Sequence, residues 1–122
     1  MPHGKICYLE IPAGDVDVAA AFYAKVFGWQ ARARGDGSRA FDDTTGAVSG
    51  SWVRGRKPGK EPGLLAYVMV DDIDATLRGV VAAGGQVATP RTALSPAGDA
   101  FATFSDPTGN VLGLYQEPQS HA

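Results

Sequence analysis

The sequence is poor in the features that mark disulfide-linked, membrane-spanning or nucleic-acid-binding proteins. A single cysteine, Cys7, among 122 residues excludes an internal disulfide and fits a reducing compartment. No apolar run approaches the roughly 20 residues that a membrane span needs, or the stretch of a signal peptide. Lys and Arg number 11 and Asp and Glu 13, so the net charge of -2 argues against a nucleic-acid partner. We therefore expect a cytoplasmic protein with neither a nucleic-acid nor a membrane partner.

Residues for nucleophilic or metal chemistry are equally scarce. The two histidines, His3 and His121, lie near opposite ends, and we assign neither a role. Cys7 lies in the apolar run ICYLEI, which predicts a buried structural thiol rather than a nucleophile. A phosphate-binding loop and a nucleophile elbow are also missing.

What remains is the composition of an ordinary globular domain. Hydrophobic residues make up 44% and charged residues 20% of a chain long enough to bury a core, so we expect one domain over residues 1–122. Sixteen glycines and eight prolines indicate many turns.

An internal repeat organises the chain. Asp-apolar-Asp occurs at Asp15 and again at Asp72, and a glycine follows thirteen positions later at Gly28 and Gly85. The aspartates are typical helix N-caps and the glycines typical helix ends, so two amphipathic helices are predicted. Their apolar faces comprise Val16, Ala19, Ala20, Tyr23 and Phe27 in the first, and Ile73, Leu77, Val80, Val81 and Gly84 in the second.

Short apolar or β-branched runs flank both helices and read as strands. They are Ile6–Ile11, Gln30–Arg34, Arg39–Asp43 and Val48–Arg54 in the first half, and Leu64–Val70, Gln86–Thr89, Ala100–Ser105 and Val111–Gln116 in the second. The segment 106–110, DPTGN, predicts a hairpin turn, which makes Asp106 a turn residue rather than a catalytic acid. We expect a first module over about 5–54, a polar connector over 55–63 and a second module over about 64–117, sharing one core.

The modules resemble the vicinal-oxygen-chelate superfamily of glyoxalases, bleomycin-resistance proteins and extradiol dioxygenases. The resemblance rests on FYAKVFGW, which closes the first helix, together with DPTGNVLGLYQ at the end of the second module. It implies an α+β fold in which two tandem βαβββ modules form a curved eight-stranded sheet around a cavity. Because many members dimerise, we also expect a homodimer.

The resemblance implies where a divalent metal would bind, because metal-dependent members place His, Gln or Glu on the first and last strand of each module. These positions fall near Ile6 or Tyr8, within Val48–Arg54, near Leu65 and at Gly113. They offer one tyrosine at most, whereas a metal site needs about three donors. We therefore expect no metal and no other cofactor. The alternative is a metal-dependent lyase, isomerase or dioxygenase whose ligands lie a residue or two away.

Strand alternation indicates which side chains face the cavity. On the first strand, Cys7, Leu9 and Ile11 should pack on the helix, so Tyr8 and Glu10 should face the cavity. The predicted ligand-binding residues are Tyr8, Trp52, Tyr67, Met69, Phe101, Thr103 and Tyr115. Core filling is an equally good interpretation for Met69 and Phe101, whereas tyrosine hydroxyls favour a wet cavity. Trp29 is interpreted as a packing residue.

These patterns predict a protein that binds a small organic molecule in an apolar, aromatic-lined cavity. Glu10 is the candidate catalytic residue, since burial could suit it to proton transfer; a structural hydrogen bond is the alternative. Catalysis stays open: an enzyme of this kind would be a lyase or isomerase of the glyoxalase type, and a binding protein without activity is the third possibility.

Overall fold

A computed structural model describes residues 3, 6–34, 38–59 and 63–118. Contacts divide the chain into two compact units, residues 1–58 and 59–122, and each is described by itself. His3 is exposed, whereas His121 and residues 60–62 of the expected connector lie outside the described residues. Neither helix of the described chain is long and apolar enough to cross a membrane.

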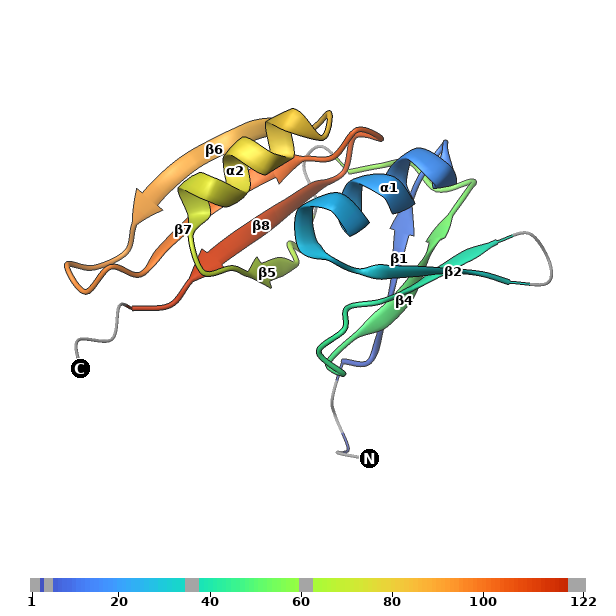
Figure 1. Ribbon diagram of the computed structural model, residues 1–122, viewed down its shortest axis with the longest axis horizontal. Helices are drawn as coiled ribbons and strands as arrows, with labels where there is room; N and C mark the ends of the chain where they lie inside the picture. Colours follow the sequence, from blue (N-terminus) through green and yellow to red (C-terminus); the bar gives the residue numbers. More distant parts are fainter. Residues whose placement is uncertain (1–2, 4–5, 35–37, 60–62, 119–122) are drawn as a thin grey trace. The chain divides into compact units, whose positions relative to one another are not determined.

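Unit 1 is a four-stranded sheet with one helix on one face (Figure 1). The strands lie in the order β1-β4-β3-β2; β1 runs parallel to β4, and the other pairs are antiparallel. The elements are β1 (Tyr8–Pro12), α1 (Val16–Phe27), β2 (Gln30–Ala33), β3 (Arg39–Asp42) and β4 (Ser49–Val53).

Unit 2 repeats this plan, with the strand order β5-β8-β7-β6. Its elements are β5 (Tyr67–Met69), α2 (Ile73–Ala82), β6 (Gln86–Ala93), β7 (Ala100–Ser105) and β8 (Val111–Gln116). The predicted α+β fold of two βαβββ modules is confirmed, and the described strands pair as two sheets of four. Strand β5 is shorter than expected. Strand β6 is longer and continues through Pro90, because an edge strand with register shifts tolerates a residue that lacks an N–H.

Both helices begin at the predicted aspartates. The Asp15 side chain accepts a hydrogen bond from the Val18 amide at 3.1 Å, and Asp72 accepts one from the Ala75 amide at 3.1 Å. Each bond satisfies one amide of the first turn that has no partner within the helix.

The helix ends agree with the prediction in α1 and differ by one residue in α2. Gly28 follows α1 with φ of 76°, the left-handed conformation that glycine adopts readily. After α2 the left-handed residue is Gly84, with φ of 98°, and not Gly85. Gly85 instead donates its amide to the Val80 carbonyl at 2.8 Å.

An aromatic cluster forms the core of unit 1 between α1 and the sheet. The ring of Trp29 stacks on Tyr23 at 4.9 Å and on Phe41 at 4.6 Å, measured between centroids. Trp52 lies 5.0 Å from Phe41 in the same cluster. The interpretation of Trp29 as a packing residue is therefore confirmed.

In unit 2, α2 packs its apolar face on the sheet. The buried side chains are Ile73, Leu77 and Val80 of the helix and Ala102, Phe104, Leu112 and Leu114 of the sheet. The predicted helix face was two residues too wide, because Val81 is 56% exposed and Gly84, which is also exposed, lies beyond the end of the helix.

The turn at 106–110 has the predicted hairpin structure. Asp106 is buried, and its Oδ1 accepts hydrogen bonds from the amides of Thr108 and Asn110, each at 2.9 Å. This carboxylate is committed to the turn, as expected.

Cys7 differs from its prediction. Strand β1 begins one residue later, at Tyr8, and the thiol is exposed. The apolar run therefore begins before the strand, and Cys7 lies in the part that precedes it.

Candidate functional site

Each sheet has one face covered by its helix and one face that the helix leaves open. On β1 the helix-covered face carries Leu9 and Ile11, and the open face carries Tyr8 and Glu10. Exposure follows this alternation, since Ile11 is 6% exposed and Tyr8 is 43% exposed. The faces predicted for Tyr8 and Glu10 are thus the ones observed.

Trp52 lies on the other face. The β1–β4 register places it beside Ile11, and it is 2% exposed within the aromatic cluster. Its indole Nε1 has no hydrogen-bond partner among the described residues. The expectation that Trp52 shares a face with Tyr8 and Glu10 is wrong, because register places Ser49 and Ser51 of β4 beside those two residues.

The open face of unit 2 gathers the other predicted residues. Register places Tyr67 of β5 beside Gly113 of β8, which in turn pairs with Thr103 of β7. One step along the strands, Met69, Tyr115 and Phe101 form a second row. All five predicted side chains of this unit therefore share one face, where Thr103 is 9% exposed.

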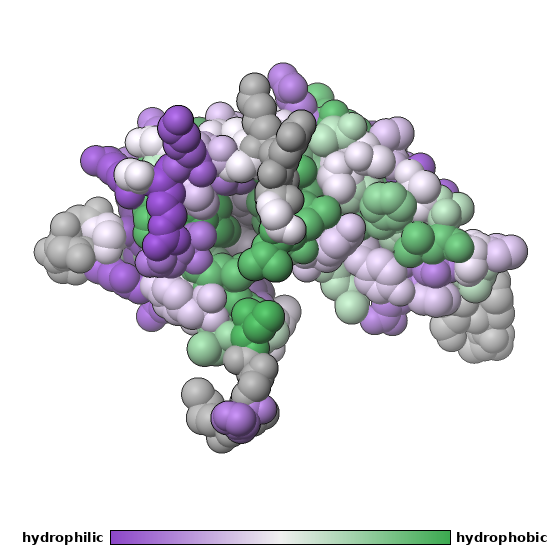
Figure 2. All heavy atoms as spheres, turned by 180° about the vertical axis from the view of Figure 1, so that it is seen from behind, coloured by the Kyte–Doolittle hydropathy of each residue, from purple (hydrophilic) through white to green (hydrophobic). Residues whose placement is uncertain are grey.

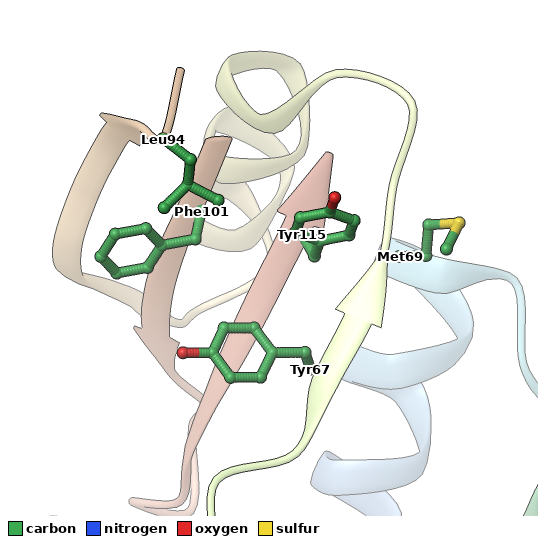
Figure 3. Close-up of a pocket in the computed structure, with 5 residues that line it drawn as sticks. All are labelled: Tyr67, Met69, Leu94, Phe101 and Tyr115. Atoms are coloured by element: carbon green, nitrogen blue, oxygen red, sulfur yellow. The ribbon is translucent and has the colours of Figure 1, made fainter. Parts of the chain in front are cut away.

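Four of these five side chains line an open pocket of about 570 Å³ (Figure 3). They are Tyr67, Met69, Phe101 and Tyr115, and Leu94 is the fifth lining residue. Leu94 was not predicted, because the strand before it was expected to end at Thr89. Strand β6 instead continues to Ala93 and brings Leu94 to the pocket. The volume lies in the range of pockets that hold small organic molecules.

The pocket lining is apolar yet accessible. Tyr67 is 51%, Met69 63% and Leu94 52% exposed. The green areas of Figure 2 show in the same way that apolar residues reach the surface of the molecule. Exposed apolar side chains that gather in a hollow, rather than scattering singly, are typical of a binding surface.

The ring of Tyr67 covers Gly113. A Cβ atom at residue 113 would meet the ring atoms Cδ2, Cε2 and Cγ of Tyr67, the last at 2.9 Å. In Figure 3 this ring extends from β5 across β8. Gly113 is the position at which the family resemblance implies a metal-binding glutamate, and here an aromatic ring fills the space of that side chain.

The open face of unit 1 is polar. The Tyr8 hydroxyl accepts a hydrogen bond from Nη2 of Arg34 at 2.7 Å. Hydrogen bonds from Ser51 and then from Arg34 hold the pKa of Tyr8 below its ordinary value. Tyr8 is therefore a phenol whose environment favours the charged form.

Glu10 forms an ion pair with Arg56 on this face, at 2.5 Å. Its side chain is 40% exposed, so the burial that made it a candidate for proton transfer is not observed. The structural alternative, a polar contact with a neighbour, is present in the form of this ion pair.

The residues present do not fit the divalent metal of the superfamily. In the described part of the chain, no three His, Cys, Asp or Glu side chains come together as a metal site. At the inherited positions, Ile6 is 72% exposed and carries no donor, and Gly113 is covered by a ring. A divalent ion needs about three convergent donors, which these positions do not supply.

Comparisons with known proteins agree with the fold. Residues 5–114 match the family model of the Glyoxalase/Bleomycin resistance protein/Dioxygenase superfamily. A "Glyoxylase-like domain-containing protein" of Didymella fabae is 31% identical over 95% of this chain and 96% of its own length. A "Probable lactoylglutathione lyase" of Vibrio cholerae is 30% identical over 100% of this chain and 97% of its own. A crystal structure of a superfamily enzyme from Burkholderia phytofirmans has a TM-score of 0.75 at 22% identity, covering 93% of this chain and 98% of that one.

Proposed function

Because the chain belongs to the glyoxalase/bleomycin resistance protein/dioxygenase superfamily, whose members bind small molecules, we propose that its pocket on unit 2 binds a small organic molecule without a metal ion. The observation that carries this proposal is the Tyr67 ring over Gly113. At the position where the family resemblance implies a metal ligand, the chain presents an aromatic surface that becomes one wall of the pocket.

The lining favours an apolar, flat ligand. Rings from Tyr67, Phe101 and Tyr115 offer faces and edges for stacking, and the thioether of Met69 adapts to irregular shapes. The tyrosine hydroxyls supply the few polar contacts that orient a ligand in a mostly apolar site. The burial of apolar surface would provide most of the binding free energy.

A fluorescence titration with a neutral apolar probe, N-phenyl-1-naphthylamine, tests the pocket. Phe101→Ala should raise the Kd of the probe roughly fivefold or more, since an aromatic contact contributes about 0.5–1.5 kcal/mol beyond the area it buries. Val81→Ala, which removes an exposed apolar side chain from α2, is the matched control and should leave the Kd unchanged. Equal Kd values for Phe101→Ala and the parent chain would sink the proposal.

A metal-dependent lyase is the second candidate, favoured by the 30% identity with the Vibrio cholerae protein. In that case formation of lactoylglutathione would require added zinc or nickel and would stop on chelation. Glu10 would be the carboxylate to examine first, and Glu10→Gln should then abolish turnover. Formation of lactoylglutathione at the same rate with and without added metal, or no formation of it, would argue for the metal-free proposal.

A homodimer is a further part of the proposal and rests on the superfamily alone. Sedimentation velocity over a range of concentrations measures it directly. A single species with the mass of one 12.7 kDa chain at all concentrations would exclude it.

A further inference from the structure

The two open faces occupy equivalent positions in the repeat but differ in chemistry. Glu10 and Tyr67 each stand five residues before a helix-capping aspartate. Glu10 pairs in register with Ser51 of β4, just as Tyr67 pairs with Gly113 of β8. The same module thus presents polar and charged groups in unit 1 and aromatic groups in unit 2.

We propose that the open face of unit 1 is a second binding site, in which Tyr8 and Arg34 bind an oxyanion such as a carboxylate or a phosphate group. Tyr8 belongs to β1 and Arg34 follows β2, and these strands form the two edges of the sheet. Their side chains nevertheless meet, with the Tyr8 hydroxyl 2.7 Å from Nη2 of Arg34. The two residues are 26 positions apart in the sequence, so their side chains meet only in the folded chain.

Within the described residues, the guanidinium of Arg34 contacts the Tyr8 hydroxyl alone, which leaves donors for a ligand. Ion pairs in the described ranges join Arg39 to Asp17 and Arg56 to Glu10, and Arg34 forms neither. Its described contact is a neutral phenol, which uses one of the five N–H donors of the group. An arginine with free donors is well suited to bind a planar or tetrahedral oxyanion through two hydrogen bonds.

Other charges on this face leave it positive. Arg32 alternates onto the open face, opposite Ala40, and is exposed. Glu10 is neutralised by Arg56, and Asp42 accepts a hydrogen bond from the Thr44 amide at 2.8 Å. Among the described residues of this face, the three arginines Arg32, Arg34 and Arg56 exceed the carboxylates Glu10 and Asp42 by one charge, which favours an anion.

The Tyr8 hydroxyl is the second hydrogen-bond donor that we assign to this site, beside the Arg34 guanidinium. Its oxygen accepts a hydrogen bond from Arg34, and its hydroxyl shares a second hydrogen bond with Ser51, a residue that is 3% exposed. When Arg34 and Ser51 both donate to the Tyr8 oxygen, the phenol O–H is left to donate to a ligand oxygen. Tyr8 is 43% exposed, so its side chain is in contact with solvent.

Titration with inorganic phosphate at constant ionic strength, followed through the Arg34 side-chain Nε–Hε NMR signal, tests the site. A saturable shift is expected in the parent chain. Tyr8→Phe, observed through the same signal, should raise the phosphate Kd roughly tenfold, because a hydrogen bond to a charged group is lost. A shift that does not saturate would overturn the proposal.

Arg34→Gln needs a second readout, since it removes the observed signal. Backbone amide shifts of Tyr8 and Ser51 serve for this variant, and it too should weaken phosphate binding roughly tenfold. Arg78→Gln, at an exposed arginine of α2, is the control and should bind phosphate normally. If Arg34→Gln and Arg78→Gln lost equal phosphate affinity, binding would depend only on the net charge of the chain, and the proposed site would not exist.

A parallel titration with acetate separates the two ligand classes. Saturation by both anions supports a general oxyanion site, saturation by one anion assigns the site to that class, and saturation by neither overturns it. Arg34→Gln should also bind N-phenyl-1-naphthylamine like the parent chain, which keeps a failure here distinct from a failure of the pocket in unit 2.

Discussion

The ring of Tyr67 lies over Gly113 and occupies the space that a side chain at position 113 would need. Strand register pairs these residues across β5 and β8. Any side chain at position 113 would enter the space of the ring. A glycine here is consistent with an aromatic wall and inconsistent with a metal-binding carboxylate at the same position.

The variant Gly113→Ala should weaken probe binding while hardly changing stability. The new Cβ displaces the ring of Tyr67, which is 51% exposed and can turn towards solvent. The Kd of N-phenyl-1-naphthylamine should rise roughly threefold to tenfold, and the free energy of unfolding should change by less than about 1 kcal/mol. Gly79→Ala, which meets nothing within 4 Å, is the control. A probe Kd unchanged by Gly113→Ala would contradict the role given to Tyr67.

The variant Gly50→Ala should have the opposite profile. Its Cβ would meet Cζ of Phe41 at 2.6 Å as well as the Leu9 carbonyl oxygen. Phe41 is fully buried in the aromatic cluster and has no room to move. We expect a loss of about 1–3 kcal/mol in the free energy of unfolding, visible as a fall of several degrees in Tm. A parent-like Tm would show that the cluster is loosely packed.

Tyr8 should ionise at lower pH than a free tyrosine. Its pKa is lowered by hydrogen bonds from Ser51 and Arg34, and absorbance of the phenolate measures this directly. One component of the phenolate titration should vanish in Tyr8→Phe, and this component should move to higher pH in Arg34→Gln. Because a lowered pKa stabilises the fold above the unfolded value of about 10, no effect on stability is expected near neutral pH. Superimposable titrations of Arg34→Gln and the parent chain would contradict the contact.

Cys7 should react in the folded protein. The single thiol is exposed, so DTNB should modify one equivalent per chain without denaturant. Cys7→Ser supplies the blank. A reaction that needs unfolding would restore the buried thiol expected from the sequence.

Local signals explain the part of the fold that the sequence predicted well. Asp15 and Asp72 cap their helices through amides three residues away, and the turn at 106–110 closes on its own side chains. Strands β7 and β8 have the predicted bounds because turn residues flank them. Such features depend on neighbours in the chain and are therefore visible in it.

The errors concern contacts between distant segments. Trp52 stands in a strand of small and apolar residues, and its face is decided by pairing with β1. The exposure of Cys7 depends on where that strand begins. The Tyr67–Gly113 contact, likewise, follows from cross-strand register, although alternation alone placed Tyr67, Met69, Phe101, Thr103 and Tyr115 on one face.

Metal content, measured by mass spectrometry on protein purified without chelator, is the most direct test of whether this chain binds its ligand by aromatic contacts in place of a metal. We predict less than about 0.1 equivalent of zinc, nickel, manganese or iron per chain, and a probe Kd that chelation leaves unchanged. Nearly one equivalent of metal, removed by chelator together with probe binding, would contradict it.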